Sequence, residues 1–126
     1  MPKRHFTLEE ANAALAILRP IVETMLAARG RIVAAQPDLW PVLEKAASNG
    51  GSDKASAVLF DFEILRKNVK AIERLGIELK DINTGLVDFL SERDGRDVYL
   101  CWRYDEPKVA FWHDLEAGFG GRQPLE

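Results

Sequence analysis

Hydrophobic residues recur every three or four positions over the first part of the chain, which is the period of one helix face. The row along this face is Leu8, Ala11, Leu15, Leu18, Val22 and Met25. Thr7 and Glu10 stand at its start with the spacing of a capping box, in which each side chain accepts a hydrogen bond from the other residue's backbone N–H. The pattern predicts a helix that begins at Thr7, is kinked at Pro20 and fades near Ala35, before Pro37.

A second helical row follows after a break rich in proline and glycine. Its apolar residues are Val58, Phe62, Leu65, Val69 and Ile72. Between the rows, residues 42–47 could form a short helix, and Asn49-Gly50-Gly51-Ser52 is typical of a turn or linker. The second long helix is expected to start at Ser52 or Asp53 and to stop at Gly76, which can adopt the left-handed conformation.

From Ile77 onward the hydrophobic period changes to two, which is typical of β-strands. We expect four strands, at residues 77–80, 86–92, 96–104 and 109–113. Asp94-Gly95 predicts a two-residue hairpin turn, and residues 105–108 predict a four-residue loop because proline does not fit a primed two-residue turn.

The fold class that follows is α+β, with a long antiparallel helical hairpin packed on a four-stranded antiparallel β-meander. We expect one domain, with the hairpin at residues 7–75, the meander at 77–114 and an irregular glycine-rich tail at 115–126. A chain of 126 residues is long enough to bury a core without a disulfide or a structural metal.

The two turns predict the register of the sheet and so divide its side chains between two faces. The inner face, toward the helices, receives these residues: Val87, Phe89, Val98, Leu100, Trp102, Tyr104, Val109, Phe111 and His113. The outer face holds Leu90, Tyr99 and Trp112, which are the interface candidates because such residues should not face water together. The tail, a ligand or a second copy of the protein could cover them, and Asp88 lies on this face within reach of Arg103.

Charge and composition narrow the classes of function. The net charge of −3 argues against broad binding to nucleic acid, which needs a positive surface. The single cysteine excludes an internal disulfide and a four-thiolate zinc site. No stretch is expected to be long enough to cross a membrane, and the N-terminus lacks the apolar run of a secretory signal, so we expect a cytoplasmic protein.

Several segments together resemble a family of prokaryotic proteins. In the C-terminal third they are Leu100-Cys101-Trp102-Arg103, Glu106-Pro107, Phe111-Trp112-His113, Gly118-Phe119 and Gly121-Arg122-Gln123-Pro124-Leu125. Earlier ones are Phe6-Thr7-Leu8-Glu9-Glu10-Ala11-Asn12, Gly76-Ile77-Glu78-Leu79-Lys80-Asp81 and Gly85-Leu86-Val87-Asp88-Phe89. The family is the domain of unknown function 2203. The resemblance covers nearly the whole chain and implies a stand-alone bacterial protein without an assigned activity or known site residues.

The candidate ligand-binding residues are Asp88, Arg103, His113, Glu116 and Arg122. His113 and Glu116 could belong to a metal site, but such a site needs a further donor, and the alternative is a core histidine bonded to a backbone carbonyl. Asp88 and Arg103 could hold a polar ligand or form a structural ion pair. Gly118–Arg122 could wrap an anion or lie over the outer sheet face.

The remaining features favour structural roles. Cys101 is predicted to be a small buried group without a thiolate-stabilising neighbour. A basic stripe on the second helix complements its dipole and is an improbable nucleic-acid site: Arg66, Lys67, Lys70 and Arg74. No nucleophile–base motif or dinucleotide fingerprint occurs, so a cofactor is not expected and an enzyme is disfavoured. The leading hypothesis is a self-associating, homodimeric binding or assembly module; the alternative is a small enzyme or a ligand- or metal-binding protein with a His/carboxylate/Arg site.

Overall fold

The structure is a computed structural model that describes residues 4–49 and 53–125, with side chains for 4–35 and 55–125. Its helices are α1 (Leu8–Asn49) and α2 (Asp53–Arg74). Its strands are β1 (Glu78–Asp81), β2 (Leu86–Arg93), β3 (Arg96–Arg103), β4 (Phe111–Asp114) and β5 (Gln123–Pro124), with a short 3-10 turn, η1 (Phe119–Gly121), before β5. Within the described residues the sheet is antiparallel in the order β1-β2-β3-β4-β5. The α+β class is confirmed, but the sheet has a fifth strand in the tail that we expected to be irregular.

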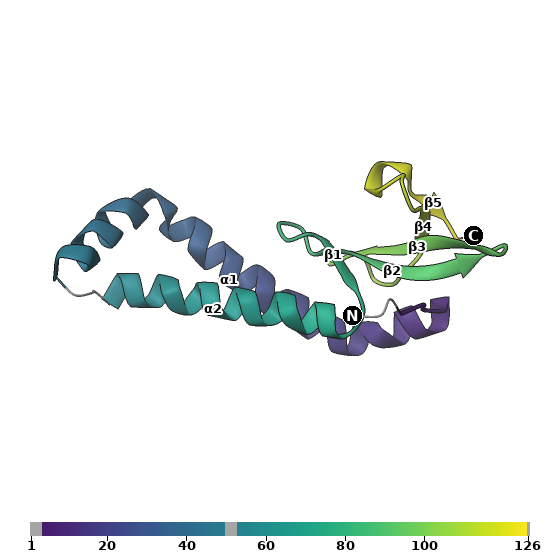
Figure 1. The fold of residues 1–126 in the computed structure, drawn as a ribbon, viewed down its shortest axis with the longest axis horizontal. Helices are drawn as coiled ribbons and strands as arrows, with labels where there is room; N and C mark the ends of the chain where they lie inside the picture. Colours follow the sequence, from purple (N-terminus) through teal and green to yellow (C-terminus); the bar gives the residue numbers. More distant parts are fainter. Residues whose placement is uncertain (1–3, 50–52, 126) are drawn as a thin grey trace.

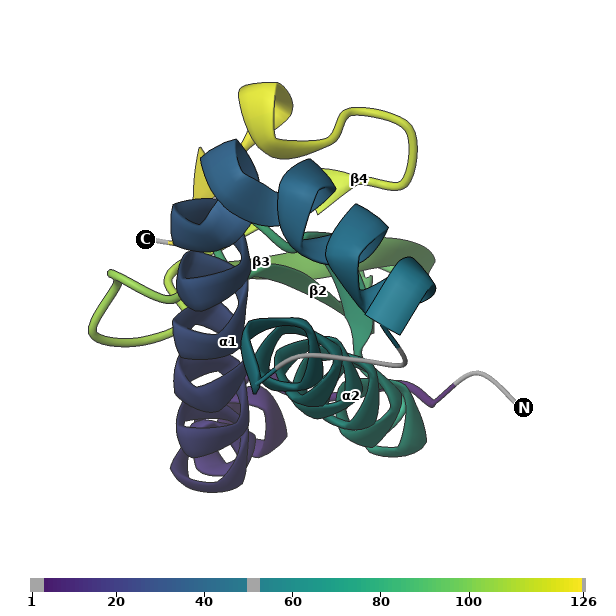
Figure 2. The ribbon, with the colours of Figure 1, turned by 90° about the vertical axis from the view of Figure 1, so that its left-hand side faces the viewer.

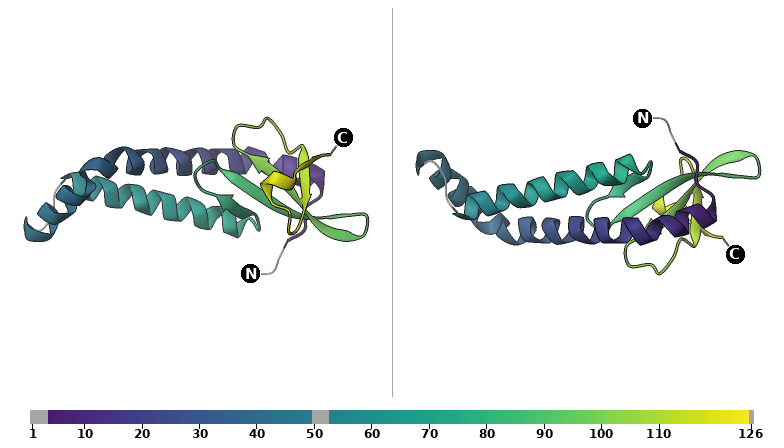
Figure 3. Two further views of the ribbon diagram at one scale, coloured as in Figure 1. Left: turned by 90° about the horizontal axis from the view of Figure 1, so that it is seen from above. Right: turned by 90° about the horizontal axis from the view of Figure 1, so that it is seen from below.

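The helices form an antiparallel pair that extends well beyond the sheet (Figures 1 and 3). The sheet lies over the half of this pair that contains the start of α1 and the end of α2. The tail after β4 lies on the other side of the sheet (Figures 1 and 2). The β-sheet therefore has helices on one face and residues of its own tail on the other.

Helix α1 begins as the sequence predicts and ends much later. The capping box is present, with the Thr7 N–H 2.9 Å from Glu10 Oε1 and the Glu10 N–H 3.1 Å from Thr7 Oγ1. The helix continues to Asn49, so the predicted end near Ala35 and the separate helix at 42–47 are wrong. Proline can be accommodated in a helix by bending, and α1 bends in its C-terminal part (Figure 1).

The predicted linker falls mostly at residues 50–52, outside the described residues, and α2 begins at Asp53. The seam of α2 differs from the predicted row at one position. Phe62 is 46% exposed, whereas Asp61 is buried and accepts a 2.8 Å hydrogen bond from Arg31 of α1. An ion pair between the helices therefore occupies a place for which hydrophobic periodicity favours an apolar group.

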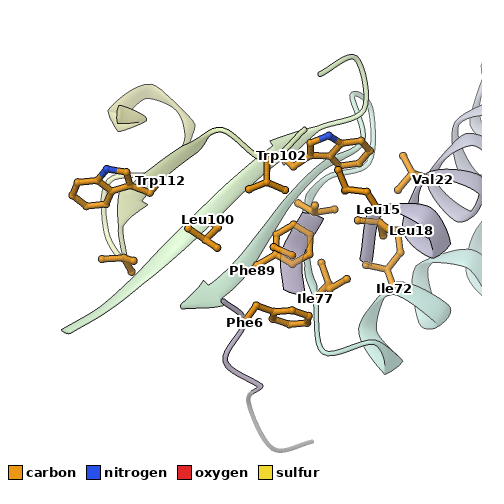
Figure 4. Packing of buried hydrophobic residues seen from close by; sticks show 14 of the residues in the cluster. Phe6, Leu15, Leu18, Val22, Ile72, Ile77, Phe89, Leu100, Trp102 and Trp112 are labelled. Carbon is orange, nitrogen blue, oxygen red and sulfur yellow. The ribbon is translucent and has the colours of Figure 1, made fainter. Parts of the chain in front are cut away.

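The core lies where α1, the end of α2 and the inner face of the sheet meet (Figure 4). The α1 row predicted from the sequence is buried from Ala11 to Met25. The segment before α1 adds Phe6, whose ring meets Phe89 edge-on at 5.2 Å. Its backbone N–H donates to Leu90 O at 2.7 Å, and its carbonyl accepts from the Ser91 hydroxyl at 2.6 Å, which fixes this segment beside β2.

The β2–β3 hairpin has the predicted turn and register. Asp94 and Gly95 have φ of 54° and 79°, as a primed turn requires, and Arg93 lies opposite Arg96. The pairing of Asp88 with Cys101 is also as expected. The turn of this hairpin therefore determines which side chains of β2 and β3 lie on each face of the sheet.

The predicted register of β3 with β4 is wrong by one residue. Leu100 lies opposite Trp112 instead of His113, and Val109 does not pair with the sheet. The reason lies in α1, where Asn12 Oδ1 accepts the Val109 N–H at 2.8 Å and the Asn12 amide reaches Val109 O at 3.5 Å. The Asn12 amide takes the place of a β3 residue as the hydrogen-bond partner of Val109. The loop after β3 is therefore longer than four residues, and each β4 side chain lies on the opposite face of the sheet from the one predicted.

Trp112 therefore shares the inner side with Leu100 and belongs to the core cluster, while His113 moves to the outer side. This correction removes Trp112 from the outer surface on which self-association was argued. Leu90 and Tyr99 remain on that face but are only 5% and 8% exposed within a single chain. The sheet is thus covered on both sides without a second copy.

Residues 8–35 of α1 are long and apolar enough to cross a membrane by length and composition alone. The expectation that no such stretch exists is wrong by this criterion. A helix at the core of a folded domain meets the same criterion, and the Ala11–Met25 row of α1 packs against the sheet and α2. The segment is therefore weak evidence for a membrane protein.

Candidate functional site

Three chemically active side chains meet on the outer face of the sheet. Asp88 comes from β2, Cys101 from β3 and His113 from β4, and one ligand atom from each lies within 4.8 Å of the other two. Their exposed fractions are 3%, 0% and 2%. Asp88 and Cys101 are direct cross-strand neighbours, while His113 reaches Asp88 from the strand beyond.

The hydrogen bonds of His113 define where its ring protons must be. The ring Nδ1 is 2.7 Å from Asp114 O, and a carbonyl oxygen can only accept, so Nδ1 carries a proton. The ring Nε2 is 3.1 Å from both Asp88 carboxyl oxygens. Two acceptors would repel each other at this distance, so a proton lies between the ring and the carboxyl group. This proton assignment follows from the hydrogen-bond network.

Cys101 is a protonated thiol in the absence of a bound cation. Burial, followed by the negative charge of Asp88, raises the pKa of its thiol to about 12, while the Arg122 guanidinium acts in the opposite direction. A thiol in this environment is a poor nucleophile, because the thiolate is the reactive form. The His113 Nε2 also engages Asp88, so a cysteine-nucleophile reaction has little support from this geometry.

Neighbouring side chains close the site on two sides. The ring of Tyr99 lies 5.5 Å from that of His113, and the Lys80 ammonium stands 5.2 Å from the Tyr99 ring. On the other side, Arg122 lies over the ring of Phe111 at 4.0 Å, and Phe111 is the register partner of Cys101. Burial, and then hydrogen bonding to Glu78, raise the pKa of Tyr99 to about 12. The cluster therefore lies in an environment with little access to water.

A thiolate, an imidazole nitrogen and a carboxylate oxygen together form a donor set for a divalent transition metal, Zn²⁺ in particular. Tetrahedral bonds of about 2.0–2.3 Å bring donor atoms to roughly 3.3–3.6 Å from one another. The Asp88 and His113 atoms already lie at 3.1 Å, and all three donors lie within 4.8 Å, so small side-chain shifts are sufficient. The bond from His113 Nδ1 to a backbone carbonyl is the usual outer contact of a metal-bound histidine.

The other candidate residues lie apart from this cluster. Arg103 pairs with Asp105 at 2.6 Å instead of with Asp88, because both lie on the same turn. Arg122 pairs with Glu106 at 2.7 Å, and Glu116 is exposed beyond the end of β4. Of the five ligand-binding candidates, the structure brings together Asp88 and His113 and adds Cys101.

The sequence contained part of the signal for this site. The predicted turn at residues 94–95 correctly placed Cys101 beside Asp88, and only the error in the β4 register moved His113 to the wrong face. The Asn12 contact that sets this register joins positions 97 residues apart, so no local pattern reveals it.

The fold and the site define a small α+β protein with a helical hairpin and a buried Asp–Cys–His cluster. The family model for an uncharacterised conserved protein, domain of unknown function 2203, matches residues 4–125, and the chain belongs to this family. Comparison with curated proteins gives no match. Comparison with solved structures gives none either.

Proposed function

We propose that this protein binds one divalent transition metal ion, with Zn²⁺ as the best fit, through Asp88, Cys101 and His113. The observation that carries the proposal is the convergence of three different donor side chains, each at most 3% exposed, on one face of the sheet. In the metal-free protein Asp88 lies 3.1 Å from His113 Nε2 and also interacts with the Cys101 thiol, so the three groups already contact one another. A metal ion would replace these contacts and serve as the common partner of all three groups.

The charges and protons of the site support this assignment. A thiolate and a carboxylate together neutralise a divalent cation, so the complex would bury little net charge. Metal binding would displace the thiol proton of Cys101 and the proton between His113 and Asp88. The third donor, His113, is already oriented, because its Nδ1–H bond to Asp114 O holds the ring with Nε2 toward Asp88.

A cobalt titration tests the proposal, because Co²⁺ accepts the same donors as zinc and gives a thiolate-to-metal charge-transfer band. We expect purified metal-free protein to bind one Co²⁺ with this band, and Zn²⁺ to displace it. Cys101→Ser should abolish the band, and Asp88→Asn should weaken binding at least about 100-fold.

The protein offers a matched control in a second histidine–aspartate pair. His5 Nε2 lies 2.9 Å from Asp97 Oδ1, but both side chains are about half exposed. Asp97→Asn should therefore leave the titration unchanged. Wild-type protein that takes up neither Co²⁺ nor Zn²⁺ at micromolar concentration, or binding that survives Cys101→Ser, contradicts the proposal.

A second candidate function, self-association, is favoured by the surface of α2 instead of the sheet. Leu59, Phe60 and Phe62 are 63%, 67% and 46% exposed, and such adjacent large apolar side chains are typical of contact surfaces. The helical hairpin would then act as the assembly element.

Light scattering across a concentration series tests this candidate. We expect wild-type dimers at micromolar concentration and monomers for Phe60→Ser. The basic residue Lys67 is exposed on the same helix, and its substitution by serine should not change the mass. A monomeric wild-type protein at these concentrations excludes self-association as the function.

A further inference from the structure

The tail is held over the sheet by an ion pair that water barely reaches. The Arg122 Nη2 atom lies 2.8 and 2.7 Å from the two carboxylate oxygens of Glu106. The exposed fractions of the two side chains are 10% and 15%. Breaking a pair this deep is more costly than breaking a surface salt bridge, because the remaining charge is left without a partner.

One end of this ion pair is fixed to the body of the protein. Glu106 Oε1 also accepts the backbone N–H of Arg103 at 2.7 Å, and its carbonyl oxygen accepts the indole N–H of Trp102 at 3.0 Å. Because Trp102 is a fully buried core residue, Glu106 is held rigidly at the end of β3. The carboxylate is therefore an anchor, and the tail is the part that can move.

Arg122, the other partner of the ion pair, belongs to the tail, which makes few contacts with the rest of the protein. The Arg122 guanidinium lies over the rings of Phe111 and Phe119, at 4.0 and 4.7 Å from the ring centres. The tail also contacts the body of the protein through the two-residue strand β5, a 3.0 Å bond from the Leu125 N–H to Ala110 O, the Leu125 side chain against the core cluster and the Phe119 ring under Arg103. Segments with few buried contacts open locally at lower free energy than the core.

Arg122 also carries a defect that favours opening. Among the described residues, its Nε is the buried side-chain polar atom without a hydrogen-bond partner. An unsatisfied buried donor reduces the stability of the closed arrangement. Arg122 is therefore bonded to Glu106 through Nη2 and has no hydrogen-bond partner at Nε.

We propose that the Arg122–Glu106 pair is a latch that controls how fast a metal ion enters and leaves the Asp88–Cys101–His113 site. This inference rests on the metal-binding function proposed above. The three donors are at most 3% exposed, so an ion cannot exchange unless part of the cover opens. The strands that carry the donors form the centre of the sheet, whereas the tail lies over Phe111, directly beside Cys101.

A latch has a kinetic signature that a merely structural residue lacks. If Arg122 stabilises the closed tail equally with and without metal, its loss speeds entry and exit by the same factor and leaves the dissociation constant unchanged. We therefore expect Arg122→Gln to raise both rates about tenfold or more, with an equilibrium affinity within about threefold of wild type.

The experiment is stopped-flow mixing of wild-type protein and variants, with Co²⁺ for entry and, from the Co²⁺-loaded protein, a chelator for exit. Arg103→Gln is the matched control: Arg103 lies over the same Phe119 ring at 5.2 Å but pairs with exposed Asp105. Its exchange rates should equal those of wild type. Glu106→Gln removes the same ion pair from the anchored side, so it tests the latch if Arg122→Gln does not fold.

The outcomes separate the latch from the binding function. No Co²⁺ uptake by wild-type protein overturns the metal site and the latch together. Normal uptake with unchanged exchange in Arg122→Gln and Glu106→Gln overturns the latch alone. Faster exit with unchanged entry, and a matching loss of affinity, also overturns it, since Arg122 would then stabilise the bound state instead of the closed tail.

Discussion

The proton arrangement around His113 makes a specific prediction for the metal-free protein. Replacing Asp88 by Ala removes the hydrogen-bond partner of a buried ring, since the His113 and Asp88 side chains are only 2% and 4% exposed. Breaking a buried pair in this way costs about 3–5 kcal/mol of unfolding free energy. We expect Asp88→Ala to lose stability of this size in urea denaturation.

Asp88→Asn should behave differently, although it also removes the charge. The ring keeps its Nδ1 proton on Asp114 O, so its Nε2 is free to accept a hydrogen bond from the new amide. Because Asn has nearly the same shape as Asp and leaves no group unpaired, we expect a loss of only about 1 kcal/mol. A variant that folds but binds metal at least about 100-fold more weakly then separates stability from binding.

Nitrogen NMR of the His113 ring provides a direct check on the reasoning. The Nδ1 proton should be present in both wild type and Asp88→Asn. An Asp88→Asn variant as unstable as Asp88→Ala, or a wild-type ring whose single proton is on Nε2, would refute this proton arrangement. Asp97→Ala removes the partner of the exposed His5 pair and should leave the urea midpoint unchanged within error.

Two further predictions concern the glycines and alkaline pH. Gly85→Ala should reduce the unfolding free energy measured in urea by about 3 kcal/mol or more, because φ is +70° and a Cβ would lie 2.7 Å from Val22 in the core. Gly95 is the control: its φ is +79°, but a Cβ would enter open space, so we expect Gly95→Ala to cost only about 1 kcal/mol. Equal losses in the two variants would contradict the packing argument. The folded protein retains the protons of Cys101 and Tyr99 up to about pH 12, whereas the unfolded chain releases them near pH 9 and 10. Above about pH 9 the unfolded state therefore binds fewer protons than the folded state. The contribution of these two groups to the unfolding free energy should be complete below this pH. Above it, the unfolding free energy should fall by up to about 1.4 kcal/mol per pH unit for each group. Thermal melts from pH 8 to 11 measure the fall, and Cys101→Ala should delay its onset by about one pH unit; a flat profile contradicts the assignment.

Much of the fold could be predicted because its signals are local. The capping box at Thr7, the apolar row that follows it and the Asp94-Gly95 turn involve neighbours in sequence, and the structure confirms them. The end of α1 could not be predicted, because proline removes a donor without always ending a helix. The fifth strand was missed for another reason: Gln123-Pro124 is too short to show an alternating pattern.

The amino-acid sequence by itself determined the α+β class, the start of α1 and the pairing that sets Cys101 beside Asp88. Only the tertiary structure decided that His113 joins them. That decision depends on Asn12 of α1, which binds the backbone of Val109 and shifts β4 by one residue, and a one-residue shift exchanges the faces of a strand. The alternation of side chains along a strand is a local property of the sequence. The register of a strand that follows a long loop is set by the distant group that forms hydrogen bonds with the loop's backbone.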